Sequence, residues 1–307
     1  MSTAPPLRAA VTGGTSGLGL ALVRELTGRG AHVAFVARTA EAVQRIAREL
    51  PNTHGIVGDV ARKDDIYPIA LQILGELGGL DVLINNASSL GPAPLRLLAD
   101  TDCEDFEVAL ATNLLGPFRL TKAVLGALTA SAREGRGAVV LNVSSDAAIN
   151  AYPTWGAYSA SKAALRHMSA IWNEELAAEG VRCLSVDPGD MDTPLHALAV
   201  PDADPTTLKR PEHAAKELVD AIVAALPVLA RSEDRALQPG AEDRALQPGA
   251  EDRALQPGAE DRGLQPGAED RGLQPGAEYR GLQPRAEDRG LQPGTEDRAL
   301  QTATGRV

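Results

Sequence analysis

The sequence predicts an α/β fold in which a doubly wound parallel sheet carries helices on both faces. Short apolar runs rich in Val, Ile and Leu alternate with segments of helical periodicity over residues 8–225. Runs that are apolar at nearly every position are typical of parallel strands, which are buried on both sides. Strict alternation predicts right-handed crossovers, so all strands end at one edge of the sheet. Ligands bind outside that edge, so the residues that follow each strand are the candidate site residues.

Six strands and six helices are expected in order. The apolar runs place strands at 8–11, 31–37, 54–57, 80–84, 138–143 and 181–186. The intervening helical periodicity places helices at 18–27, 40–50, 64–77, 105–132, 159–178 and 212–225.

The composition fits a globular protein: 44% of the 307 residues are hydrophobic and 23% are charged. No apolar run reaches the roughly 20 residues of a membrane helix, and the N-terminus lacks the pattern of a secretory signal. Two cysteines suggest a reducing compartment, and we expect a cytoplasmic protein. The five histidines are scattered, so no metal site is expected. A net charge of −11 argues against nucleic acid or an anionic membrane as a partner.

From Glu233 onward the chain is a nine-residue repeat, EDRALQPGA with variants. One Leu per unit buries too little apolar area to offset the ordering of the backbone, and the recurring Pro stops helix growth. The unit also lacks the residues of the calcium-binding nonapeptide pattern. We therefore expect one folded domain over 1–232 and a disordered, solvated tail over 233–307, with a multivalent interaction tail as the alternative.

A glycine-rich loop follows the first strand. Its glycines at 13, 17 and 19 allow a tight turn, close backbone approach to a phosphate and close packing of helix on sheet. The helix that follows begins with free N–H groups that suit a pyrophosphate. Glycine clusters also mark ordinary turns, but this position favours dinucleotide binding. The candidate cofactor-binding residues are Thr12, Gly13, Ser16, Gly17, Leu18 and Gly19.

The spacing TGxxxGxG resembles the short-chain dehydrogenase/reductase family, which has a Rossmann-type sheet. The resemblance runs from about residue 9 to about residue 225, with further motifs along that length. It implies that Asp59, followed by Val60, contacts the adenine; a helix N-cap is the other role for this Asp. It also implies that Asn86 and Ala87, within an NNA segment, lie beside the cofactor.

The end of the second strand predicts NADP(H) rather than NAD(H). By analogy with the family, Ala37 occupies the discriminating position and carries no charge. An acidic residue there would bond the 2′-hydroxyl of NAD, whereas the guanidinium of Arg38 suits a phosphate. The alternative is that Arg38 is simply solvated at a strand end. Ser16 stands where many NADP-preferring relatives carry a basic residue.

Tyr158 and Lys162 are four residues apart in a helical segment, so they share one helix face. An unperturbed tyrosine ionises near about 10, and a neighbouring ammonium lowers that pKa. Ser145 lies 13 residues before Tyr158, just past the fifth strand, where its hydroxyl can bond a substrate carbonyl. Ser144 is the neighbouring candidate, but alternation points it the other way and the family spacing favours Ser145.

Asn113 lies in a long helical segment that Gly116 and Pro117 interrupt. Pro117 has no N–H, so the carbonyl of Asn113 loses its helical partner. The resemblance implies that this carbonyl holds a water that links Lys162 to solvent. A plain helix kink is the alternative. Because Asn113, Ser145, Tyr158 and Lys162 occur in family order and spacing, we expect them to form the catalytic group.

The turn after the sixth strand resembles the family's PGxxxT motif. The resemblance implies that Thr193 meets the nicotinamide carboxamide and that Pro188 and Gly189 shape the pocket. Residues 194–210 are expected to form a mobile substrate lid, with an inert loop as the alternative. The candidate substrate-lining residues suggest an apolar pocket: Ile149, Tyr152, Trp155, Met191 and Leu195.

The resemblance implies an NADP(H)-dependent oxidoreductase that interconverts a carbonyl and a secondary alcohol on a small-molecule substrate. Tyr158 and Lys162 would also contact the cofactor. Residues 228–230 are a short candidate strand before the repeat, where the family has a seventh strand and a tail against a partner subunit. Homodimer and homotetramer both stay open. The alternative, from a different functional class, is a nucleotide-binding protein without catalytic activity whose repeat tail recruits partners.

Overall fold

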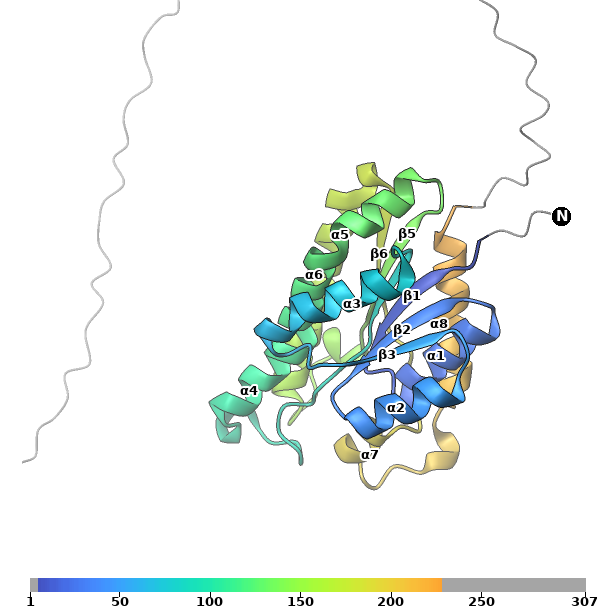
Figure 1. Ribbon diagram of the computed structural model, residues 1–307. Coiled ribbons are helices and arrows are strands. Elements are labelled where there is room, and N and C mark those ends of the chain that lie inside the picture. Colours follow the sequence, from blue (N-terminus) through green and yellow to red (C-terminus); the bar gives the residue numbers. More distant parts are fainter. Residues whose placement is uncertain (1–4, 228–307) are drawn as a thin grey trace, which may run out of the picture. The chain divides into compact units, whose positions relative to one another are not determined.

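A computed structural model describes residues 5–227, and the architecture below refers to that range. Strands and helices alternate along the chain (Figure 1). The strands are β1 (Arg8–Thr12), β2 (His32–Ala37), β3 (Thr53–Val57), β4 (Val82–Asn85), β5 (Ala138–Val143) and β6 (Val181–Val186). The helices are α1 (Gly17–Gly28), α2 (Ala40–Glu49), α3 (Ile66–Leu77), α4 (Cys103–Leu110), α5 (Gly116–Arg133), α6 (Gly156–Leu176), α7 (Pro194–Ala199) and α8 (Pro211–Ala225).

The strands form one parallel sheet in the order β3-β2-β1-β4-β5-β6. The order reverses direction between β1 and β4, where Ala10 pairs with Leu83. This is the switch point of a doubly wound sheet, at which ligands bind. The predicted fold class is confirmed.

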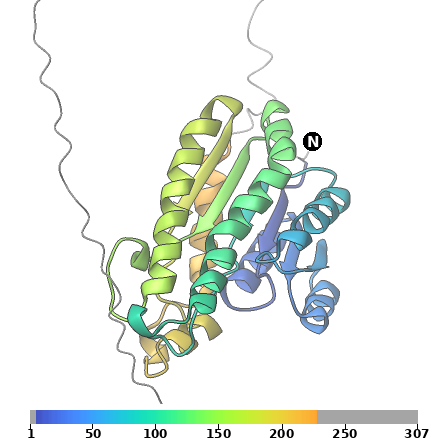
Figure 2. The ribbon, with the colours of Figure 1, turned by 90° about the vertical axis from the view of Figure 1, so that its left-hand side faces the viewer.

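Side-chain alternation along the strands divides the core into two layers. On β1, Ala9 and Val11 face one layer and Ala10 faces the other. The first layer packs against α1, α2 and α8, and the second against α3 and α5. Figure 1 shows these two sets of helices on opposite faces of the sheet, and Figure 2 shows α5 and α6 running along one face with α8 behind.

The segment 105–132, expected as one helix, is three pieces. It divides into α4, a π-helical turn over Ala111–Leu115 and α5. A π turn lengthens the hydrogen-bond spacing, and Pro117, which lacks an N–H, lies just beyond it in the first turn of α5. Segment 194–210, expected as a mobile lid or an inert loop, contains the short helix α7. The expectations for the seventh strand and the repeat tail fall outside the described residues.

The edge of the sheet opposite the strand C-termini is held by one buried carboxylate. Asp81 precedes β4 and is fully buried. Its Oδ1 lies 2.7 Å from Arg8 Nη2 and 3.0 Å from Arg136 Nε, and the Ser131 hydroxyl donates to the same oxygen. Burial raises the pKa of Asp81, but hydrogen bonds from Arg136 and Arg8 outweigh it and hold the pKa well below its usual range.

None of the helices described between residues 5 and 227 combines the length and the apolar character that crossing a membrane requires. In the same range, no three His, Cys, Asp or Glu side chains gather as they would around a metal ion.

We predict that Asp81→Asn lowers the free energy of unfolding by about 3–5 kcal/mol, because it leaves two partly buried guanidinium groups without their anion. Urea unfolding at neutral pH measures the loss. Asp220→Asn is the matched control, since this exposed carboxylate pairs with Arg29 and Lys216 at the surface, and it should change stability far less. Because the folded-state pKa of Asp81 is lowered, its contribution is present at neutral pH and disappears only in acid. Equal effects of the two substitutions would contradict this account.

Candidate active site

A cavity of about 880 Å³ lies where the strands end. The loops that follow all six strands line it, and α7 covers part of it. Of the predicted site residues, those on the cavity wall are Gly13, Ser16, Gly17, Leu18, Gly19, Arg38, Asp59, Val60, Asn86, Ala87, Ser145, Tyr158, Lys162, Pro188, Gly189 and Thr193. The two others, Thr12 and Asn113, are buried behind this wall.

The glycine-rich loop leaves the start of α1 open toward the cavity. Gly13 has φ +71°, which L side chains rarely adopt. A Cβ on Gly19 would collide with the carbonyl oxygen of Gly13, so only glycine allows the helix to pack this closely. Ser16 is the N-cap of α1, but its side chain makes no capping hydrogen bond. The amides of the first turn have no intrahelical acceptors and can therefore receive a phosphate.

Thr12 acts by joining two strand ends. Its Oγ1 accepts hydrogen bonds from the amides of Asn86 and Ala87, both at 3.0 Å. In return, the Nδ2 of Asn86 donates to the Thr12 carbonyl at 2.8 Å. This pairing fixes the loop after β4 against the end of β1. Thr12 is 2% exposed, so its side chain supports the cofactor-binding loops from behind.

The residues at the end of β2 present a positively charged side chain, and no carboxylate, to the cavity. Ala37 and Arg38 both line it, and the Arg38 side chain is exposed. Asp59, after β3, also lines the cavity, while its Oδ1 accepts a hydrogen bond from the amide of Ala61 at 3.0 Å. Asp59 thus has the turn-capping contact that its position suggests and still faces the cavity.

Lys162 connects α6 to the end of β5. Its side chain is 2% exposed, and its Nζ donates to the carbonyl of Val143 at 2.8 Å. The same nitrogen lies 5.6 Å from the centre of the Tyr158 ring, as expected for residues one helical turn apart. Burial lowers the pKa of Lys162 to about 8.

The pKa of Tyr158 differs from the value that sequence reasoning suggests. Burial of the phenol raises it to about 12, while the neighbouring hydroxyls of Ser145 and Ser88 act in the opposite direction. The sequence predicts instead that the adjacent ammonium lowers it. In the protein alone, desolvation of the phenolate is the largest contribution, so Tyr158 holds its proton at neutral pH.

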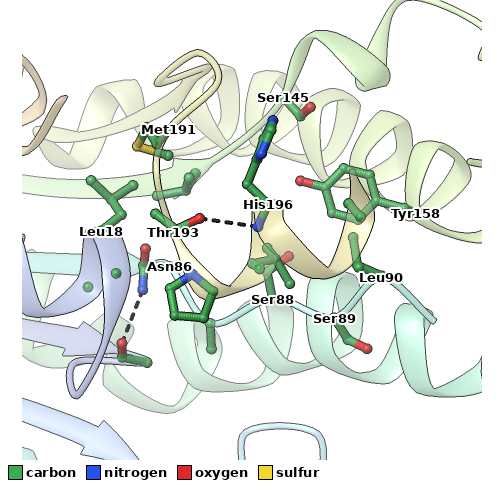
Figure 3. Close-up of a pocket in the computed structure, with 18 of the residues that line it drawn as sticks. Leu18, Asn86, Ser88, Ser89, Leu90, Ser145, Tyr158, Met191, Thr193 and His196 are labelled. Carbon is green, nitrogen blue, oxygen red and sulfur yellow. Dashed lines mark hydrogen bonds between the residues drawn. The ribbon is translucent and has the colours of Figure 1, made fainter. Parts of the chain in front are cut away.

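Ser145 lies just past the end of β5. Its Oγ donates to Oδ1 of Asp146 at 3.1 Å and accepts from the amide of Ala147 at 3.2 Å. Ser144 also lines the cavity, and its buried hydroxyl has no hydrogen-bond partner among the described residues. Figure 3 shows the Ser145 and Tyr158 hydroxyls in the same part of the cavity.

The side chain of Asn113 has four hydrogen bonds. Its Oδ1 accepts from Ser88 Oγ at 3.1 Å and from the Ser89 amide at 2.8 Å. Its Nδ2 donates to the Ser89 carbonyl at 2.7 Å and to Ser161 Oγ at 2.8 Å. The side chain therefore fixes the loop after β4 to α6, directly beside Lys162. Ser88 contributes to this network through its bond to Oδ1 of Asn113.

The segment after β6 forms a wall of the cavity. Thr193 is the N-cap of α7, and its Oγ1 accepts from the amide of His196 at 3.2 Å. The base of the segment is closed by Lys209, whose amide donates to the carbonyl of Asp190 at 2.9 Å. Of the residues expected to line an apolar pocket, Tyr152, Trp155, Met191 and Leu195 do so. Ile149 does not, because it is 69% exposed and outside the cavity.

His196 is the main cavity residue that sequence reasoning does not identify. Sequence reasoning weighs the histidines only as metal ligands, for which their spacing is wrong. A usable signal is present: Thr193 followed by proline is typical of an N-cap and first helical position. A helix starting there places residue 196 in its first turn, next to the cavity. The carboxylates of Asp146 and Asp190 are likewise cavity residues that the sequence does not reveal.

The chain is similar in sequence and in fold to known oxidoreductases. A 2-(R)-hydroxypropyl-CoM dehydrogenase from Xanthobacter autotrophicus is 32% identical over 192 residues, which span 61% of this chain and 75% of that protein. An L-fucose dehydrogenase from Mus musculus is 33% identical over 196 residues, 64% of this chain and 69% of its own. The crystal structure of a variant of actinorhodin polyketide ketoreductase with NADPH superposes with a TM-score of 0.66 at 26% identity, covering 74% of this chain and 95% of that one.

The family described as short chain dehydrogenase matches residues 8–204. The match spans the glycine-rich loop, the strand ends that line the cavity and the first part of the segment that covers it. The chain belongs to the short-chain dehydrogenase family of oxidoreductases.

Proposed function

We propose that the protein is an NADP(H)-dependent reductase that interconverts a carbonyl compound and a secondary alcohol, with Asn113, Ser145, Tyr158 and Lys162 as its catalytic group. The observation that carries this proposal is that Tyr158, Lys162 and Ser145 line the same cavity as the glycine-rich loop. The cavity lies at the strand ends of a doubly wound sheet, which is where such folds bind dinucleotides. Similar proteins include dehydrogenases and a ketoreductase solved with NADPH.

The cavity wall fits a dinucleotide. The open first turn of α1 and the close approach that Gly19 permits suit the pyrophosphate. Asp59 and Val60 would lie by the adenosine, Asn86 and Ala87 by the central part, and Thr193 with the Pro188-Gly189 turn by the nicotinamide. When bound, this cofactor supplies or accepts the hydride.

The chain's own residues handle the proton. Tyr158 keeps its proton at neutral pH, because burial raises its pKa to about 12, and it can therefore donate that proton to a carbonyl oxygen as the oxygen becomes an alkoxide. Ser145 Oγ orients the same oxygen through a hydrogen bond. Once Tyr158 has given up its proton, the ammonium of Lys162 stabilises the resulting phenolate. The Asn113 side chain holds the Ser88–Ser89 loop and Ser161 in place. Pro117 has no N–H, so the Asn113 carbonyl lacks its usual helical donor.

A panel of carbonyl compounds tests the proposal. Methyl ketones that end in an alkyl, a hydroxyl or a carboxylate group, each at three chain lengths, are incubated with NADPH while its oxidation is followed. Turnover of at least one compound is expected. Turnover of none would contradict the proposal and favour the nucleotide-binding protein without activity.

Arg38→Ala is expected to remove most of the preference for NADPH over NADH, because a charge-assisted contact to the 2′-phosphate contributes about 1–3 kcal/mol. Titration of both cofactors into both proteins measures the preference. Arg48→Ala, an exposed arginine on α2 outside the cavity, is the matched control and should leave it unchanged. Equal affinities of the unsubstituted protein for NADPH and NADH would contradict the NADP assignment.

Tyr158→Phe is expected to lower kcat by about 10²–10⁴-fold while NADPH still binds, because only the proton donor is removed. Steady-state kinetics and a cofactor titration give the two quantities. Tyr67→Phe makes the same chemical change on a side chain that is 77% exposed on α3, so it should behave like the unsubstituted protein. Near-normal turnover by Tyr158→Phe would mean that another group donates the proton.

The two directions of the reaction should differ in pH dependence. Alcohol oxidation needs the phenolate of Tyr158, and its fraction rises about tenfold per pH unit below the pKa. Carbonyl reduction needs the protonated phenol, which predominates at neutral pH. We therefore expect kcat/KM for oxidation to rise from pH 6 through pH 8 and kcat/KM for reduction to stay level over that range. Profiles of the opposite sign would exclude Tyr158 as the proton-transfer group.

A further inference from the structure

The part of the cavity beyond the glycine-rich loop carries an unusual set of charges. We call this part the substrate end; its polar lining residues include Ser145, Asp146, Tyr152, Tyr158, Asp187, Asp190 and His196. Three of these are carboxylates. The apolar side chains of Leu90, Trp155 and Leu195 also line this part of the cavity and pack around Tyr158.

Asp146 is held as an anion next to Ser145. The hydroxyl of Tyr152 donates to its Oδ2 at 2.6 Å, and Ser145 Oγ donates to its Oδ1 at 3.1 Å. The bond from Tyr152 lowers the pKa of Asp146 most. The negative charges of Asp187 and Asp146 both act on the Tyr158 phenol and oppose its ionisation. The field of these carboxylates therefore reaches the point at which the substrate oxygen would bind.

The cations near the substrate end are already engaged. Lys162 Nζ donates to the Val143 carbonyl and lies beside the Tyr158 ring, whose phenolate it would stabilise. Lys209, near Gly189, pairs with Glu217 at 2.8 Å. Arg38 stands at the end of β2 among the cofactor-binding residues. Among the residues the structure describes on this wall, no further Lys or Arg could neutralise an acidic substrate group.

His196 instead offers a hydrogen-bonding contact for an uncharged group of a ligand. Its side chain is 15% exposed, and its Nδ1 is buried without a hydrogen-bond partner among the described residues. Its Nε2 lies 3.9 Å from Oδ1 of Asp190. Figure 3 shows the ring on the same side of the cavity as the hydroxyls of Ser145 and Tyr158. Because Nδ1 is buried within the protein, a ligand can reach only the exposed part of the ring. A hydroxyl can either donate to an imidazole nitrogen or accept from it.

We propose that the substrate end selects carbonyl compounds that carry a hydroxyl group and no anionic group, with His196 binding that hydroxyl and the carboxylates of Asp146, Asp187 and Asp190 repelling acids. The inference rests on the proposed reductase function and names its substrate class. Repulsion by fixed charges is an established means of specificity, and these three exposed carboxylates line the cavity that a substrate must enter. The apolar side chains there would receive the alkyl part of the same molecule.

Three probes of nearly equal length separate the contributions: 4-hydroxy-2-butanone carries a hydroxyl, 2-pentanone carries neither group, and acetoacetate carries a carboxylate. We expect kcat/KM with NADPH to fall by about tenfold or more at each step in that order. An acetoacetate value equal to or above that of 2-pentanone would overturn the inference alone. Failure to reduce any compound of the full panel would instead overturn the proposed function.

Substitutions test which residues cause the two expected decreases in kcat/KM. His196→Leu should bring the ratio of 4-hydroxy-2-butanone to 2-pentanone close to one, and His196→Gln, which keeps hydrogen-bonding atoms, should restore part of it. Asp187→Asn/Asp190→Asn should raise kcat/KM for acetoacetate relative to 2-pentanone. The control Asp64→Asn/Glu104→Gln makes the same charge change on exposed residues outside the cavity and should not. An unchanged hydroxyl ratio in a folded His196→Leu protein, or equal effects of the two double variants, would also overturn the inference.

Discussion

The burial of the Lys162 ammonium is the constraint on which the site depends. A cation that is 2% exposed needs polar partners, and the Val143 carbonyl at the end of β5 supplies one. That bond fixes α6 against the strand that leads into Ser145. Because Tyr158 lies one turn before Lys162 on α6, the same bond sets the phenol in the cavity. Burial lowers the pKa of Lys162 to about 8 and raises the pKa of Tyr158 to about 12. The pKa of each group will therefore change when a charge is added nearby.

Two further networks hold the walls around this pair. Thr12 and Asn86 join the ends of β1 and β4, and the Asn113 side chain joins the loop after β4 to Ser161 on α6. Thr12 and Asn113 themselves are buried behind the cavity surface. At the far edge of the sheet, Asp81 joins the starts of β1 and β4 to the turn before β5. Buried polar networks of this kind fix strand ends that apolar packing alone would leave free to shift.

The fold could be predicted well because continuous apolar strands and alternating helices leave few other arrangements. Strand ends shifted by a residue or two, as at β4. The π turn before α5 could not be predicted, although Pro117 indicates a break, because a proline does not determine how the helix around it readjusts. The glycine-rich loop could be located because glycine is required there by geometry. His196, Asp146 and Asp190 could not be recognised, since their role depends on how α7 folds over the cavity, and the pKa of Tyr158 depends on a degree of burial that spacing does not reveal.

The ionisation of the Tyr158 phenol tests the central claim most directly. Tyrosine labelled with ¹³C at Cζ reports it by NMR, and Tyr158→Phe assigns the signal among the four tyrosines. With NADP⁺ added, the account predicts a pKa well below the value of about 12 that holds for the protein alone, and a return toward that value in Lys162→Met. A pKa that stays at about 12 with NADP⁺ bound, in both proteins, would contradict the claim that Lys162 prepares Tyr158 for proton transfer.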